Sequence, residues 1–135
     1  MNDTPHVEPR YVEPGGFQKL IGYEITEWAV GHAVLTLNFD NNHANRHGFA
    51  HGGVMMTMLD AACTRAGAVC PDTGDIRSAA TISMTTNFIR PGQGSLLKAV
   101  GRKTGGGRRI FFATAEIFDE NNELLASALT TGRYS

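Results

Sequence analysis

Apolar residues recur with two different periods along this chain, and the change of period separates its elements. Between residues 23 and 39, bulky and polar residues alternate on both sides of Gly31-His32, which indicates two strands joined by a turn. Across residues 52–69 the apolar positions recur at steps of three and four, the period of a helix, and Pro71 ends this run. Four further alternating runs indicate strands at residues 79–89, 95–103, 109–118 and 123–134.

The order of these elements predicts an α+β domain. A hairpin, one long helix and a meander of four strands follow one another, and a lone apolar helix buries its surface only if the sheet wraps around it. A short helix ended by Gly22 is expected within residues 14–22, before the hairpin. Residues 1–13 are polar and contain proline, so we expect a flexible arm there and a single domain over residues 14–135.

Length and composition narrow the class of protein. The chain has 135 residues, of which 41% are hydrophobic and 19% are charged, as expected for one globular core. A net charge of -1 argues against a nucleic-acid binder, and no run approaches the roughly 20 apolar residues that cross a bilayer. The N-terminus lacks the apolar segment of a signal peptide, and Cys63 and Cys70 are the only cysteines. We therefore expect a cytoplasmic protein with reduced thiols and no membrane partner.

The candidate chemistry lies where the polar loop 40–49 leads into the long helix. A helix that begins at Gly52-Gly53 presents backbone N–H groups without intrahelical acceptors, and glycine lets a ligand carbonyl approach closely. The helix dipole favours negative charge at the same end, which suits an oxyanion hole. Asp60 stands later in the helix among apolar neighbours. If shielded from water, its carboxylate would suit a general base or a nucleophile, and the alternative is a place on the solvent side of the helix.

The spacing Asn45-x5-His51-Gly52-Gly53-x6-Asp60 resembles that of the hotdog-fold acyl-CoA thioesterases of the phenylacetic-acid-degradation (PaaI-like) type. The resemblance implies an antiparallel sheet wrapped around one long central helix, and it extends over roughly residues 15–133. Later segments that resemble strands of the same family, in the same order, are 87–91, 107–112, 117–119 and 124–126.

The resemblance assigns roles to residues at matching positions. Gly52 would donate its backbone N–H to the thioester carbonyl, and Asp60 would activate water or attack the thioester itself. His51 would position the substrate or the turn. Asn45 would form a hydrogen bond near the thioester or the attacking water.

Two hydroxyl groups complete the site that the resemblance implies. Thr64, one turn after Asp60, matches a position that is often polar, and the family also takes a hydroxyl from the next strand of the partner subunit. Counting back from Pro91 selects Thr81 for that hydroxyl, whereas counting forward from Asp60 selects Ser78; we prefer Thr81. The resemblance therefore implies a homodimer that forms the site, with the central helices side by side, and a homotetramer made of two such dimers.

Coenzyme A carries phosphates, so basic residues near the mouth of the site have a function in this family. The alternative for each of them is a solvated strand end. The expected substrate and coenzyme A contacts are Gly53, Arg90, Arg108 and Arg109, with Arg102 and Lys103 as further candidates.

Other kinds of site are poorly supported by the sequence. His43, His47 and His51 stand at steps of four, but Gly48 interrupts the segment and no cysteine or second carboxylate accompanies them, so we expect no metal. There is no Gly-x-Ser-x-Gly elbow, and the glycines 105–107 fit a hairpin turn better than a phosphate loop.

The sequence therefore predicts an acyl-CoA thioesterase without cofactors, acting on an aromatic or medium-chain acyl-CoA. One alternative is a hotdog dehydratase or hydratase acting on acyl thioesters, which generally places a histidine and an acid in a different arrangement. Another is a non-catalytic acyl-CoA-binding module, which would not need the carboxylate of Asp60 beside the thioester. The sequence does not decide which acyl group is bound, nor whether Asp60 acts as a general base or as a nucleophile.

Overall fold

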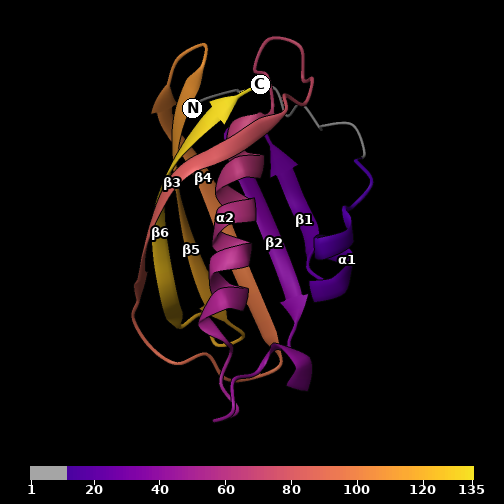
Figure 1. Cartoon of the computed structure of the whole chain (residues 1–135), viewed down its shortest axis with the longest axis vertical. Coiled ribbons are helices and arrows are strands. Elements are labelled where there is room, and N and C mark those ends of the chain that lie inside the picture. The colour runs from indigo at the N-terminus through magenta and orange to yellow at the C-terminus, as the bar shows by residue number, and fades with distance from the viewer. Residues whose placement is uncertain (1–11) are drawn as a thin grey trace.

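The computed structural model describes residues 12–135, so most of the expected N-terminal arm, residues 1–11, lies outside the described residues. Six strands form one antiparallel sheet that curls around a single long helix, which confirms the expected α+β architecture (Figure 1). The elements are α1 (Gly16–Ile21), β1 (Glu24–Ala29), β2 (His32–Asn38), the 3-10 helix η1 (Asn41–His43), α2 (Gly52–Ala68), β3 (Ala79–Phe88), β4 (Leu96–Gly106), β5 (Ile110–Asp119) and β6 (Leu124–Tyr134).

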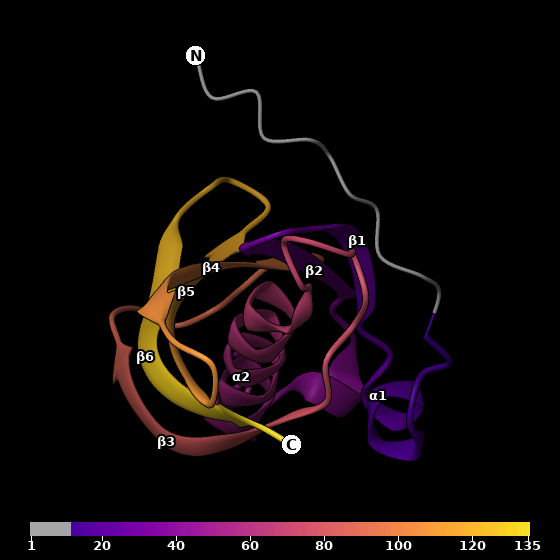
Figure 2. The same ribbon diagram turned by 90° about the horizontal axis from the view of Figure 1, so that it is seen from above.

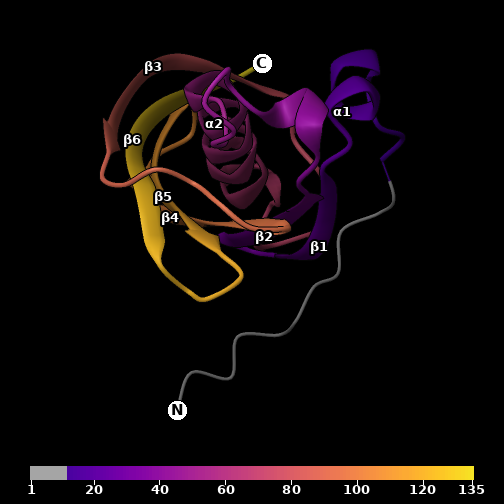
Figure 3. The ribbon, with the colours of Figure 1, turned by 90° about the horizontal axis from the view of Figure 1, so that it is seen from below.

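The order of strands in the sheet is β1-β2-β4-β5-β6-β3, so the expected meander of the last four strands is wrong. β3 pairs with β6 rather than with β4, and β4 pairs with β2. The connection from β3 to β4 crosses beside the start of α2, where Ile89 N–H donates to Leu125 O and Ala50 N–H donates to Gly92 O. Seen along the helix from either end, the sheet encloses α2 from β1 round to β3 (Figures 2 and 3).

The hydrophobic core fills the space between α2 and the concave face of the sheet. Its largest fully buried side chains include Met58, Leu59 and Cys63 of the helix, which face Leu35, Leu97, Ile117 and Leu125 of the sheet. Burying one such side chain contributes about 1.5–3 kcal/mol. Within residues 12–135, no helix reaches the length and hydropathy that crossing a membrane requires.

Two glycines, which have no side chain, let elements of the core approach each other closely. A Cβ at Gly101 of β4 would lie 2.3 Å from the backbone oxygen of Ala62, so α2 rests directly on the backbone of this strand. A Cβ at Gly67 would lie 2.3 Å from the ring of Phe111, which occupies that space instead. The hydroxyl of Tyr134 donates to Gly67 O at 2.7 Å and fastens the end of the helix to β6.

β3 is an edge strand with an irregularity near its start. Its pairing with β6 shifts between Thr81 and Ser83, a β-bulge that leaves Ile82 without a partner residue. Side chains alternate along a regular strand, so Thr81 and Phe88, seven residues apart, would point to opposite faces. The extra residue in the bulge places both against α2, where Thr81 bonds Asp60 and the Phe88 ring lies 3.4 Å from where a Cβ of Gly52 would stand.

Candidate functional site

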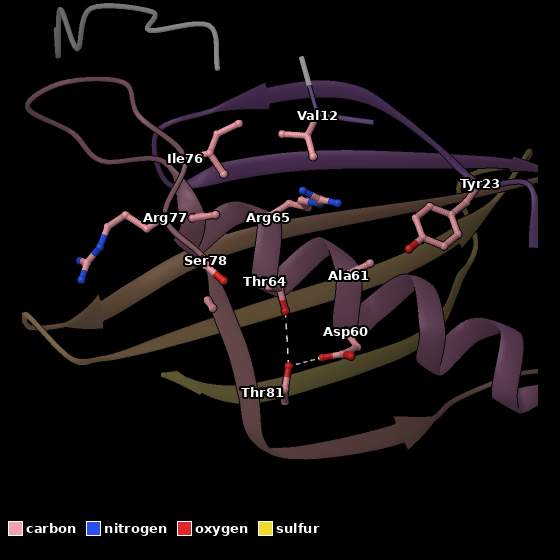
Figure 4. Close-up of a pocket in the computed structure, with 12 residues that line it drawn as sticks. Val12, Tyr23, Asp60, Ala61, Thr64, Arg65, Ile76, Arg77, Ser78 and Thr81 are labelled. Atoms are coloured by element: carbon pink, nitrogen blue, oxygen red, sulfur yellow. Dashed lines mark hydrogen bonds between the residues drawn. The ribbon is translucent and has the colours of Figure 1, made fainter. Parts of the chain in front are cut away.

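A carboxylate on α2 and a hydroxyl on β3 meet at the centre of the candidate site. Thr81 Oγ1 donates to Asp60 Oδ1 at 2.5 Å, and Thr64 Oγ1 lies 3.3 Å from Thr81 Oγ1 (Figure 4). Thr64 follows Asp60 by one helical turn and therefore shares its face of α2. The structure thus brings together three of the residues that the sequence suggested, with Asp60 and Thr64 half-buried.

The hydroxyl beside Asp60 comes from the same chain, which corrects the expectation that a partner strand supplies it. β3 starts at Ala79 and runs along α2 because it pairs with β6, and this path carries Thr81 over the helix. Ser78, the other candidate, lies 3.5 Å from the hydroxyl of Ser135 and makes no hydrogen bond to Asp60 among the described residues.

A hollow of about 620 Å³ opens beside Asp60 and Thr81. Its size falls in the range of small-molecule binding sites. One stripe of α2 forms its floor, and the start of β1 and the segment that leads into β3 form its sides. The lining residues are Val12, Tyr23, Asp60, Ala61, Thr64, Arg65, Ala68, Ile76, Arg77, Ser78, Ala79 and Thr81.

The start of α2 offers one free backbone donor. His51 is the N-cap, and its Nδ1 accepts the N–H of Gly53 at 2.8 Å, so His51 holds the turn and Gly53 N–H is occupied. Gly52 N–H has no acceptor among residues 12–135. Gly52 precedes Asp60 by eight residues, or about 12 Å along a helix, so the two cannot contact one thioester carbonyl within a single chain.

Asn45 orders the loop before α2. Its Oδ1 accepts the backbone N–H of His47 at 2.9 Å and of Phe49 at 3.1 Å, and its own N–H donates to Phe49 O at 2.7 Å. The side-chain oxygen is therefore occupied by hydrogen bonds within the loop. Only the side-chain NH2 group of Asn45 can donate a hydrogen bond to a ligand.

The three expected arginines do not gather in one place. Arg90 follows β3 near the start of α2 and forms an ion pair with Glu123. Arg108 and Arg109 lie in the turn between β4 and β5, near the other end of α2, where Arg108 O accepts a hydrogen bond from Arg77 at 2.9 Å. All three expected arginines are exposed, so a single chain does not assemble the expected coenzyme A contacts.

Of the histidines before α2, His43 and His51 have structural partners. His43 is buried, accepts the N–H of Asp40 at Nδ1 and lies 2.6 Å from Ile21 O at Nε2. His47 is exposed. No group of three His, Cys, Asp or Glu side chains within residues 12–135 is placed to hold a metal ion.

Burial changes the acidity of two groups near Asp60. It raises the pKa of the Cys63 thiol to about 11, so this cysteine stays protonated and unreactive at neutral pH. It also raises the pKa of the Tyr23 phenol, while the positive charge of Arg65 opposes the shift and the negative charge of Asp60 adds to it.

Sequence reasoning did not find Tyr23 and Arg65 as site residues. Arg65 follows Asp60 by five residues, so on a helix it lies at the opposite border of the stripe of α2 that lines the hollow. The helical period could therefore have indicated Arg65 as a residue of the site. Tyr23 lies 37 residues before Asp60, and no local pattern connects them.

A family model and a related protein both match large parts of the chain. A family model described as "Thioesterase superfamily" matches residues 47–126. The protein "Putative esterase SSO1253" of Saccharolobus solfataricus is 28% identical over 112 residues, which are 82% of this chain and 72% of that protein.

Solved structures share the fold. The PaaI protein of the phenylacetic acid degradation operon of E. coli is 22% identical, with a TM-score of 0.79 over 90% of this chain and 85% of that chain. A hypothetical thioesterase of Streptococcus pneumoniae, solved with coenzyme A, is 23% identical, with a TM-score of 0.74 over 84% of this chain and 85% of that chain.

Proposed function

Because the chain belongs to the thioesterase superfamily, we propose that it is an acyl-CoA thioesterase of the PaaI-like type in which Asp60 drives hydrolysis. The observation that carries the proposal is the hydrogen bond from Thr81 to Asp60 at the edge of the 620 Å³ hollow. A half-buried carboxylate that one hydroxyl holds in place is suited to act on a bound thioester. The coenzyme A in the pneumococcal structure supports this class of substrate.

Thr81 orients the carboxylate for either of two reactions. It bonds Oδ1, and Oδ2 has no hydrogen-bond partner among residues 12–135. As a general base, Asp60 takes a proton from water while the water oxygen attacks the carbonyl carbon; the C–S bond then breaks and the proton passes to the leaving sulfur. As a nucleophile, the carboxylate attacks instead, expels the thiolate and forms an anhydride that water hydrolyses.

A second copy of the chain supplies the oxyanion donor in this proposal. Gly52 N–H lies about 12 Å from Asp60 in its own chain, so the donor near Asp60 must be Gly52 of a partner. If each chain gives Gly52 to the other's Asp60, a two-fold axis relates the helices, which run antiparallel and meet at the midpoint, Met56. Met56 is 38% exposed, unusual for a large apolar side chain on a helix that the sheet encloses, and this supports the arrangement.

The same two-fold arrangement joins the separated arginines. The antiparallel pair places the start of one α2, with Arg90, beside Asp60 of the other, about 12 Å from the helix end near which Arg108 and Arg109 lie. These side chains then surround one mouth and can bind the phosphates of coenzyme A. A second interface forms the homotetramer on the outer face of the sheet, where Phe112 and Leu129 are 48% and 63% exposed.

The first experiment compares free thiol release from aromatic and aliphatic acyl-CoAs by the unaltered protein and by Asp60→Asn. We expect kcat to fall about 10²- to 10⁴-fold in the variant, because the amide cannot accept the proton. Asp75→Asn, which changes an exposed loop carboxylate, is the matched control and should keep full activity. Hydrolysis that survives in Asp60→Asn refutes the role of Asp60. Binding without hydrolysis by the unaltered protein would indicate a binding module.

A single turnover in water labelled with oxygen-18 tests for the anhydride route. Label in the Asp60 carboxylate requires an anhydride that water opens at the aspartyl carbon, and it eliminates the pure general-base route. Label in the released acid alone is expected if Asp60 only activates water or if water opens the anhydride at the acyl carbon, so only label in Asp60 decides between the routes.

A further inference from the structure

The wall of the hollow that faces away from Thr81 carries a guanidinium and a phenol. Successive residues turn about 100° around a helix, so Arg65 lies about 140° around α2 from Asp60 and about 7.5 Å farther along it. Asp60 borders β3, whereas Arg65 borders β1, and the small side chain of Ala61 lies between them (Figure 4). Tyr23, at the start of β1, directs its hydroxyl toward the same space (Figure 4).

Trp28 of β1 holds Arg65 in position. The guanidinium carbon stands 5.1 Å from the centre of the indole ring, a cation–π contact, and the indole Nε1–H donates to Arg65 O at 2.8 Å. None of the ion pairs found within residues 12–135 involves Arg65. The cation is therefore fixed by an aromatic face, and no described carboxylate occupies its N–H groups.

Tyr23 adds a neutral donor beside this cation. Burial raises the pKa of its phenol, so the hydroxyl is protonated at neutral pH and can donate a hydrogen bond. The phenol responds to the charges of both Arg65 and Asp60, so it lies in the field of the two groups. Its hydroxyl makes no hydrogen bond among the described residues, although the side chain is half-buried. A ligand that reaches this wall meets a fixed positive charge and one further donor.

We propose that Arg65 and Tyr23 bind a carboxylate at the far end of the acyl group, so that the preferred substrates are short acyl-CoAs ending in a carboxylate. The inference rests on the proposed function, which places the thioester at Asp60. A negative group near Asp60 would be repelled, whereas at the Arg65 end it gains a planar donor fork that matches a carboxylate. The separation of the two ends limits the acyl chain to a few carbons.

The test compares adipoyl-CoA with hexanoyl-CoA, which have acyl chains of equal length and differ in the terminal carboxylate. The unaltered protein should favour adipoyl-CoA in kcat/KM by about 10-fold or more. Arg65→Met should lower this preference about 10- to 100-fold, the usual effect of removing a charged hydrogen-bond partner. Arg65→Lys should restore part of it. Tyr23→Phe should lower it about 3- to 10-fold. Arg133→Met, an exposed arginine of β6, is the matched control.

Three outcomes overturn the inference while leaving the proposed function intact. One is a preference for hexanoyl-CoA in the unaltered protein. Another is an equal loss on both substrates in Arg65→Met, which would assign the guanidinium to the phosphates of coenzyme A. The third is an unchanged preference in Arg65→Met.

Equilibrium binding separates failure of the inference from failure of the proposed function. Titrating adipoyl-CoA and hexanoyl-CoA into Asp60→Asn, with and without Arg65→Met, measures the same preference without turnover. If the unaltered protein hydrolyses neither of these thioesters nor any other acyl-CoA of the panel, the proposed function fails. An Arg65-dependent preference in binding then still supports the carboxylate site, and its absence refutes it.

Discussion

At the scale of single residues, Gly52 contributes to the proposed chemistry through its backbone N–H and has no side chain. Only a substitution that removes its N–H tests the donor directly, and proline does so. Gly52 is the first residue of α2, the helical position that proline favours. The preceding residue, His51, has φ -62° and ψ 135°, the extended conformation that a following proline requires.

We expect Gly52→Pro to lower kcat about 10²- to 10³-fold, the usual effect of removing one oxyanion donor, with little change in thermal stability. Gly52→Ala is its matched control. The added Cβ would stand 3.4 Å from the Phe88 ring, an ordinary contact, and the N–H stays. Thiol-release kinetics and thermal melts of both variants check the expectation. Equal activity of the two variants would remove Gly52 N–H from the mechanism.

The sequence predicted those site residues that lie in one local segment or at a countable distance from a landmark. Asp60 and Thr64 share a helical face, and the count back from Pro91 selected Thr81, although as a hydroxyl of the partner strand, whereas Thr81 of the same chain lies beside them. Tyr23 and Arg65 were missed because their proximity to Asp60 arises from the packing of β1 against α2. The grouping of the arginines that we propose depends on a second copy of the chain, and the sequence of one chain does not reveal it.

At the scale of elements, the contact between α2 and β4 depends on the absence of a side chain at Gly101. This position brings the strand backbone against Ala62 of the helix, two residues after Asp60. Close packing leaves little space to absorb an added methyl group, and a backbone oxygen cannot rotate away as a side chain does. The strand backbone therefore sets the distance between α2 and the sheet.

We expect Gly101→Ala to destabilise the protein by about 2–3 kcal/mol, since overpacking of a core costs amounts of this order. Gly105→Ala on the same strand is the matched control, because a Cβ there would meet nothing within 4 Å. Urea denaturation of both variants measures the difference. Equal stabilities would mean that α2 moves away from β4 without cost.

Local patterns in the sequence predicted the helices and strands, but they did not predict the order of the strands in the sheet. The helical period ended α2 within one residue of the observed end, and the glycine at position 22 ends α1 with φ 93°. The place of β3 beside β6 depends on pairs of residues that lie from 38 (Phe88 and Ala126) to 55 (Ala79 and Tyr134) positions apart, and alternation along one strand carries no information about such pairing. Sequential strands usually neighbour each other, and this general tendency led to the incorrect meander.

At the scale of the whole molecule, the proposed site takes its carboxylate and its oxyanion donor from different chains. A mixture of two inactive variants, Asp60→Asn and Gly52→Pro, therefore has a defined outcome. In a mixed dimer one site receives both substitutions, and the other receives neither. Random pairing makes half of the dimers mixed, so about a quarter of the unaltered activity should return.

Co-expression of the two variants, or unfolding and refolding them together, allows the chains to exchange. Thiol release and the mass of the assembly are then measured on the same sample. Each variant refolded alone is the control and should stay inactive. A sample that forms dimers but regains no activity would show that both groups act within one chain, or that the donor is not Gly52.

The bulge in β3 has a consequence for recognising this site in other proteins. Ile82 is 57% exposed and has no partner in β6, while its neighbours on both sides keep their pairs. A chain that lacked this one residue would retain the same pairing and keep its hydroxyl over the carboxylate. The number of residues between the threonine and Pro91 is therefore free to vary by one, and a search that demands a fixed interval between these two would overlook relatives. The strand that pairs with β6 identifies the hydroxyl more reliably than any count.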